Sequence, residues 1–213
     1  MRTEDLIAQL AQDSRPVRPD AVVRRLVLGI GIGAFISAVL VVLWLGPRDD
    51  VGAAMQGASY WIKWAYTLSL AAAALAMTTQ LARPDTGRVR GLWLIAIPVL
   101  LLASVGVVEL LRAPRSDWLS LWLGQSWTVC PLLVLILAVP IFGGLLWSFR
   151  QLAPTQLRAA GAAAGLTAGA FAASVYCLHC PEVSALFVLT WYSLGILLAT
   201  FAGAMLGPRL LRW

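Results

Sequence analysis

The chain has 213 residues, of which 60% are hydrophobic and only 12% are charged, with 16 Lys and Arg against 10 Asp and Glu. A soluble domain carries about 25% charged residues, so this composition excludes a soluble globular protein. Backbone groups in lipid must be paired within their own segment, and a helix of about 20 apolar residues crosses the bilayer core. The predicted fold class is therefore all-α, a polytopic membrane protein with six transmembrane helices in one bundle and short loops. The six apolar runs are Leu26–Leu45, Tyr60–Leu81, Gly91–Leu111, Trp127–Trp147, Leu157–Leu178 and Ala185–Leu206.

Residues 1–25 precede the first apolar run and form the main polar segment. In MRTEDLIAQLA, the side chains of Leu6, Ile7 and Leu10 recur at helical spacing on one face. The RPVRP stretch then ends the helix, because each proline disfavours helical backbone at the residue before it. We expect a short amphipathic helix tethered to a transmembrane domain of residues 26–213. A tail that frays or lies on the lipid surface is the alternative, because so short a helix is marginal in water.

Positive residues are spread unevenly between the two sides of the membrane. If the N-terminus is cytoplasmic, twelve of the 16 Lys and Arg lie on that side, and the excess marks the cytoplasmic side. We therefore predict that both termini are cytoplasmic. The net charge of +6 then reflects topology and anionic lipid rather than direct nucleic-acid binding. The outer side holds the remaining four, Arg48, Lys63, Arg112 and Arg115.

Ionisable residues within the apolar runs are few. Lys63 lies near the outer end of its run, so we expect its ammonium group to reach the interface. Glu109 lies one turn from the outer end of its run and is expected to be hydrated. With a single histidine and widely separated acids, neither a Ser-His-Asp triad nor a pair of catalytic carboxylates can form. We therefore expect no enzyme and no cofactor.

Glycines recur every fourth residue in three of the runs. This spacing lets helix backbones approach closely in lipid. We interpret the stretch GIGIGA as a helix-packing motif too. A dinucleotide-binding fingerprint would need a preceding strand, whereas this stretch lies inside an apolar run. These regularly spaced glycines would serve either a helix contact within the chain or one in a homo-oligomer. The glycines are Gly29, Gly33, Gly161, Gly165, Gly169, Gly203 and Gly207.

The three cysteines are expected at the same outer face. Cys130 follows Trp127 at the outer start of the fourth run, and in the stretch CLHCPE Cys177 and Cys180 close the fifth run, with His179 between them. Three interpretations remain open. The thiols and His179 are soft metal ligands, the thiols form a redox switch such as Cys130 with Cys180, or buried cysteines simply pack as small hydrophobic residues.

The start MRTEDLIAQLA, six apolar runs, the Cys130–Pro131 pair and the block HCPEVSALFVLTWYSLGILLA together resemble the NrsF family of bacterial membrane anti-sigma factors. The resemblance covers essentially the whole chain. Its most specific parts are the start MRTEDLIAQLA and, after the fifth run, a block of nine named residues. These are His179, Cys180, Pro181, Glu182, Phe187, Thr190, Trp191, Tyr192 and Gly195.

The resemblance implies a multi-pass protein of the bacterial inner membrane that holds an extracytoplasmic-function sigma factor inactive. Its cytoplasmic N-terminal segment would bind the sigma factor, with Leu6, Ile7 and Leu10 inserted into a groove. Two periplasmic cysteines, matching Cys130 and Cys180, would respond to oxidising or heavy-metal stress. Cys177 is then a lipid-facing bystander or a resolving thiol.

Two other classes of function remain as alternatives. A small heavy-metal transporter would need ligands along its path and on the inner side, where no cysteine is expected. A quinone-linked membrane thiol oxidoreductase would use CLHC as its active pair, with Cys130 as a relay.

Overall fold

The computed structural model describes residue 3 and residues 21–82, 93–152 and 154–212. Every regular element among these residues is helical, which confirms the predicted all-α class. The predicted partner-binding residues Leu6, Ile7 and Leu10 lie outside the described residues.

The described residues form six long helices and several short ones. The short elements include two π-helical stretches, η1 and η3, each at one end of a long helix. The long helices are α2 (Ala21–Leu40), α4 (Ala58–Leu81), α5 (Trp93–Arg112), α7 (Cys130–Phe149), α8 (Leu157–Tyr176) and α10 (Ser193–Leu210). The short elements are η1 (Val41–Leu45), α3 (Val51–Ala54), η2 (Arg115–Asp117), α6 (Trp118–Leu123), α9 (Ala185–Phe187) and η3 (Val188–Tyr192).

Five helical segments of the described chain are long and apolar enough to cross a membrane. The predicted run Tyr60–Leu81 forms α4, whose 24 residues are also long enough. However, α4 contains Lys63 and several hydroxyl and aromatic side chains, which lower its hydropathy, so six spans remain a prediction. The first helix begins at Ala21 rather than Leu26, so the last residues of the predicted polar segment belong to this helix. The five segments are Ala21–Leu45, Trp93–Arg112, Cys130–Phe149, Leu157–Tyr176 and Ala185–Leu210.

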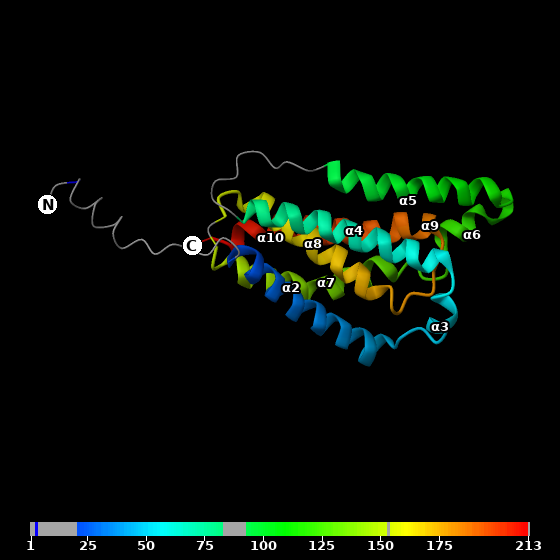
Figure 1. Ribbon diagram of the computed structural model, residues 1–213, viewed down its shortest axis with the longest axis horizontal. Helices are drawn as coiled ribbons and strands as arrows, with labels where there is room; N and C mark the ends of the chain where they lie inside the picture. Colours follow the sequence, from blue (N-terminus) through cyan, green and yellow to red (C-terminus); the bar gives the residue numbers. More distant parts are fainter. Residues whose placement is uncertain (1–2, 4–20, 83–92, 153, 213) are drawn as a thin grey trace.

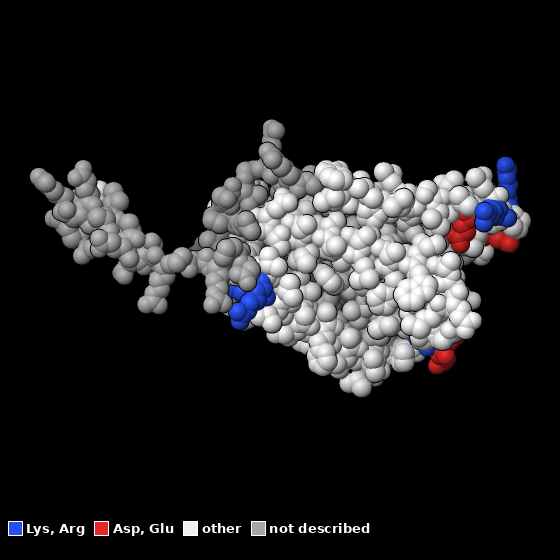
Figure 2. Space-filling model, in the orientation of Figure 1, with Lys and Arg blue, Asp and Glu red and all other residues white. Residues whose placement is uncertain are grey.

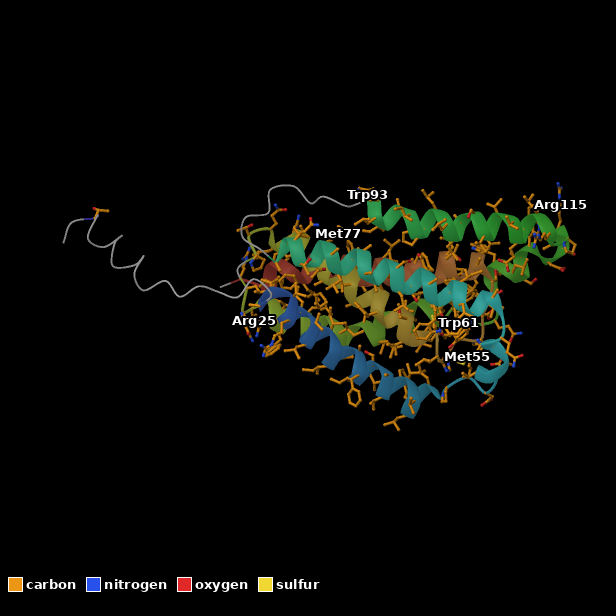
Figure 3. The ribbon with its side chains drawn as sticks, in the orientation of Figure 1. Arg25, Met55, Trp61, Met77, Trp93 and Arg115 are labelled. Carbon is orange, nitrogen blue, oxygen red and sulfur yellow. The ribbon has the colours of Figure 1, made fainter. Side chains whose placement is uncertain are left out.

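The long helices lie side by side and alternate in direction (Figure 1). The start of α2 and the end of α10 lie at one end, here called the N-terminal end of the bundle. The start of α7, the end of α8 and η3 lie at the opposite end, here called the cysteine end. Arg25 marks the first end, while Met55, Trp61 and Arg115 lie toward the second (Figure 3). On the face in Figure 2, charged side chains gather at both ends with an uncharged band between them, as expected for a membrane-spanning bundle.

Helix α8 is the centre of the bundle, and 72% of its most apolar 18-residue stretch is buried. It packs against α10, α4 and α7. Gly161 faces Gly203, and Gly165 faces the carbonyl oxygen of Ala199, so closely that an added Cβ atom would overlap the opposing backbone. The predicted close packing of small residues is therefore a contact within the chain, between α8 and α10.

A second glycine-lined interface joins α2 to α7. A Cβ atom on Gly29 would strike the backbone of Gly144, and one on Gly33 would strike the backbone of Ile141. Between these helices the buried hydroxyl of Ser37 donates a hydrogen bond of 2.7 Å to the carbonyl oxygen of Leu137. Helices α2 and α7 are therefore joined along their backbones, as α8 and α10 are.

Candidate functional site

All three cysteines are buried, unpaired thiols at the cysteine end of the bundle. Cys130 is the first residue of α7, Cys177 directly follows α8, and Cys180 lies three residues further on in the CLHCPE turn. The thiol of Cys130 interacts electrostatically with those of Cys180 and Cys177. The fold thus brings the three cysteines together at one end of the bundle, as predicted. These three side chains are called the thiol cluster below.

Cys177 faces the protein interior rather than lipid, with 0% of its surface exposed. Its sulfur donates to the carbonyl oxygen of Ala173 at 3.3 Å and lies 4.0 Å from the Thr67 hydroxyl of α4. The lipid-facing alternative is therefore wrong. A thiol buried in this way is shielded from solvent and reagents while the turn is closed.

Two buried tyrosines border the thiols. The rings of Tyr176 on α8 and Tyr192 in η3 lie 5.5 Å apart. Tyr176 interacts through its side chain with Cys180 and Cys130, the two predicted sensing thiols. The hydroxyl of Tyr192 interacts through its side chain with Cys180 and Cys177, but it forms no hydrogen bond of full geometry with any described residue.

His179 points away from a shared metal site. Its Nδ1 atom lies 2.8 Å from the carbonyl oxygen of Gly46, which follows η1. Among the described residues, no three His, Cys, Asp or Glu side chains are arranged to hold a metal ion. The geometry of this turn gives the metal interpretation of Cys130, Cys177, His179 and Cys180 no support.

Lys63 is buried in the cysteine end, with 1% of its surface exposed. The expectation that its ammonium group reaches the membrane interface is therefore wrong. Its Nζ atom instead donates to the main-chain oxygens of Cys180 and Glu182, each at 2.9 Å. The ammonium also lies 5.6 Å from the centre of the Tyr192 ring, a cation–π distance. Lys63 therefore fixes the part of the turn that carries Cys180.

The model of the NrsF family, described as a negative regulator of sigma F, matches residues 10–213. The chain is 40% identical over 216 residues to a probable anti-sigma-F factor NrsF of Azospira oryzae. It is 39% identical over 215 residues to the anti-sigma-F factor NrsF of Caulobacter vibrioides. Both matches cover 100% of each chain. The chain belongs to the NrsF family. No solved structure matches it.

In this NrsF-family chain, Glu182 ties the turn to the loop that leads into Cys130. Its carboxylate accepts a hydrogen bond of 2.7 Å from the main-chain N–H of Gln125. The neighbouring Gly124 has a φ of +56°, and a Cβ atom there would lie 2.7 Å from the Glu182 carboxyl carbon and from the Phe187 ring. A glycine is therefore required where the Glu182 carboxylate approaches the chain.

Two further residues of the predicted motif block are placed around the turn. Trp191 of η3 donates from its indole N–H to the carbonyl oxygen of Trp122 at 2.8 Å, and its ring lies 5.3 Å from that of Trp127. Pro181 lies between Cys180 and Glu182, and its nitrogen carries no hydrogen to donate. The carbonyl groups on either side of Pro181 are the two that Lys63 binds.

Several functional contacts were not evident from sequence. Glu109 of α5, expected to be hydrated, accepts from the Ala185 N–H at 2.9 Å and from the Ser184 hydroxyl at 3.1 Å, so it caps α9. Arg48 donates its main-chain N–H to the carbonyl oxygen of Leu178 at 3.1 Å. The sequence shows that Glu109 is a polar residue near the end of an apolar run. It does not show where the side chain points, because that depends on how the helix is rotated about its axis.

Arg48 is oriented by an exposed carboxylate. Its Nε and Nη2 atoms donate to Asp50 at 2.6 and 2.7 Å, and its Nη1 atom lies 3.5 Å from the Cys180 carbonyl oxygen. The hydrogen bonds from Arg48 lower the pKa of Asp50, and the same pairing raises the pKa of Arg48. This ion pair adds a weaker contact to the turn from the surface side.

At the N-terminal end, α7 holds the root of the segment predicted to bind the partner. The Ser148 hydroxyl donates to the carbonyl oxygen of Arg25 at 2.9 Å, and the Arg25 guanidinium donates to the carbonyl oxygen of Gln151 at 2.9 Å. Helix α7 therefore carries Cys130 at one end and contacts Arg25 at the other. The contact connects the thiol cluster to the start of α2 through one helix.

Proposed function

We propose that this chain is an inner-membrane anti-sigma factor that sequesters an extracytoplasmic-function sigma factor and releases it on a periplasmic thiol signal. The observation that carries the proposal is its full-length similarity to two proteins named as anti-sigma-F factors. The cytoplasmic N-terminal segment, residues 1–25, binds the sigma factor through Leu6, Ile7 and Leu10. Holding the sigma factor at the membrane keeps it from promoter DNA.

Both chain ends face the cytoplasm in this proposal, and the cysteine end of the bundle faces the periplasm. The excess of positive residues on the side of the termini supports this orientation. The start of α2 and the end of α10 lie at the same end of the bundle, as an even number of spans requires. In the periplasm, thiols are free to form disulfides.

The route from thiol to partner runs through α7. A change in the bonding of Cys130 or Cys180 moves the first turn of α7 relative to the CLHCPE turn. Because α7 is joined to α2 by close glycine contacts at Ile141 and Gly144, the two helices shift together. The shift reaches Arg25 and therefore the tether of the partner-binding segment. Two arrangements of the bundle, biased by the state of the thiols, are what such a switch requires.

Co-purification of the sigma factor with the full-length chain from membranes tests this proposal. Replacing Leu6, Ile7 and Leu10 with serine removes the apolar face of the binding helix, and we expect the sigma factor to be lost while membrane insertion is unchanged. Ala8→Ser with Gln12→Ser changes the opposite helical face and serves as the matched control. Undiminished co-purification with the triple variant would show that the segment does not bind the partner.

The same assay, repeated after oxidant or heavy-metal treatment, tests the signal. Wild type should release the sigma factor, whereas Cys130→Ser with Cys180→Ser should retain it. A double variant that responds like wild type would leave the cysteines with only a packing role, even if the N-terminal segment binds as proposed.

A further inference from the structure

The hydroxyl of Tyr192 is an unpaired donor inside the thiol cluster. The side chain is 0% exposed, and the hydroxyl has no hydrogen-bond partner among the described residues. Buried polar groups are nearly always paired, because an unpaired one loses its hydrogen bonds to water without replacement. The hydroxyl interacts with the thiols of Cys177, Cys180 and Cys130, and with Cys180 also through its side chain, but at less than full hydrogen-bond geometry. A thiol sulfur is a weak acceptor, which explains why the hydroxyl stays unpaired in the reduced protein.

We propose that the Tyr192 hydroxyl is a positioning group for an oxidised form of Cys180, in which the sulfur carries one oxygen atom as a sulfenic acid. This inference rests on the proposed thiol response and names the chemistry of its first step. The added oxygen is a strong acceptor, so it supplies the partner that the hydroxyl lacks in the reduced state. The buried Lys63 ammonium, which is held at the Cys180 carbonyl oxygen at 2.9 Å, favours negative charge in the same region.

The oxidant is a hydroperoxide, and the step balances as a two-electron transfer. The Cys180 sulfur attacks the terminal peroxide oxygen, so that an S–O bond forms and the O–O bond breaks. Sulfur is oxidised by two electrons, the peroxide is reduced to an alcohol or water, and the thiol proton passes to the leaving oxygen. Cys130 then attacks the sulfenic sulfur, so that an S–S bond forms and the oxygen leaves as water. Tyr176 interacts with both of these reacting thiols.

Tyr192→Phe separates this role from a role in packing. The variant removes only the hydroxyl, so relief of the unpaired group should raise the midpoint of thermal unfolding by about 2–4 °C. Loss of the donor should also reduce the sulfenic acid that accumulates on Cys180. One hydrogen bond to the added oxygen corresponds to at most about a tenfold change in population. A residue needed only for packing would not combine higher stability with less oxidation product.

The experiment uses the reduced, full-length chain in detergent, treated with hydrogen peroxide and a 1,3-dione that alkylates sulfenic acids. Adducts are assigned to individual cysteines by mass spectrometry. We expect an adduct at Cys180 in the wild type and about tenfold less in Tyr192→Phe. The matched control is Tyr66→Phe, because the Tyr66 hydroxyl is paired with Ser193 at 2.6 Å. That variant should lose thermal stability and keep the wild-type adduct level.

Two results would overturn the inference. One is the absence of a Cys180 adduct in the wild type, which needs no variant and holds even if Tyr192→Phe fails to fold. The other is equal labelling of wild type and Tyr192→Phe. Neither measurement uses the sigma factor, so the inference can fail while the anti-sigma function stands. Conversely, a chain that binds no sigma factor can still form the adduct.

Discussion

The glycine-lined helix interfaces and the CLHCPE turn are stabilised by different kinds of contact. Between α8 and α10, and between α2 and α7, the backbones themselves touch at glycines. Such interfaces have few side-chain rotamers to rearrange. The turn has no regular helix from Cys180 to Ser184, and side chains from other elements fix its position. The comparison indicates two stiff helix pairs and, at the cysteine end, a turn held by side-chain hydrogen bonds that can break and re-form.

The turn contacts several parts of the cysteine end of the bundle. The segment after η1 contributes Arg48 and α4 contributes Lys63, while Glu109 of α5 binds the Ser184 hydroxyl where the turn meets α9. The loop before α7 contributes the N–H of Gln125. Two of the adjoining helices also begin or end in π-helical stretches, η1 and η3, which frequently occur at functional sites. A chemical change at Cys180 therefore affects several helices at once.

The largest expected effect comes from breaking a stiff interface. In Gly161→Leu the new side chain meets the carbonyl oxygen of Gly203 across the α8–α10 contact. Overpacking of this kind costs about 3 kcal/mol, and we expect loss of the folded protein from membranes. Membrane abundance and thermal unfolding in detergent measure it. Gly143→Leu is the matched control, because a Cβ atom there meets nothing within 4 Å. Equal behaviour of the two variants would contradict backbone contact as the basis of stiffness.

A smaller and more local effect is expected from Lys63→Met, which removes the ammonium but keeps most of the side-chain length. The carbonyl groups of Cys180 and Glu182 then lose their donor, so the turn opens more often. A loss of about 1.4 kcal/mol from these charged hydrogen bonds gives about tenfold faster alkylation of the buried thiols. The rate of labelling by a thiol reagent under native conditions measures it.

Arg115→Met is the control for Lys63→Met, because Arg115 is exposed and stacks on Trp118 away from the turn. It should leave the labelling rate of the cysteines unchanged. A Lys63→Met protein with wild-type labelling and normal stability would show that the turn is closed by its surroundings rather than by the lysine.

Hydropathy predicted the long helices because a long apolar run in a bilayer must pair its backbone polar groups within the run itself. The spacing of Gly161, Gly165 and Gly169 predicted close packing for the same local reason. Which helix would face them was not predictable, because a repeat of small residues fits any partner with the same pattern. The structure selects α10.

The contacts of Lys63 could not be predicted from the sequence. Its position along α4 was evident, but its direction depends on the rotation of α4 against α8, which no local pattern specifies. The common location of Cys130, Cys177 and Cys180 was predictable from the alternation of the spans. The unpaired Tyr192 hydroxyl was not, because a missing hydrogen bond is a property of three-dimensional neighbours.

The smallest effect is expected at the surface contact to the turn. Asp50 is exposed and orients Arg48, whose Nη1 atom lies at the long distance of 3.5 Å from the Cys180 carbonyl oxygen. Because water and salt screen such pairs, Asp50→Asn should change thiol labelling by no more than about twofold, and less at high salt. The hydrogen bonds from Arg48 lower the pKa of Asp50 in the folded chain. Asp50 therefore contributes to the free energy of unfolding above the usual pKa range of aspartate, where its carboxylate is ionised in both the folded and the unfolded chain. That contribution is lost as the pH falls through the lowered pKa, and the unfolding midpoints of Asp50→Asn and wild type should then converge. An effect on labelling as large as that of Lys63→Met would mean that the surface pair, rather than the buried ammonium, keeps the turn closed.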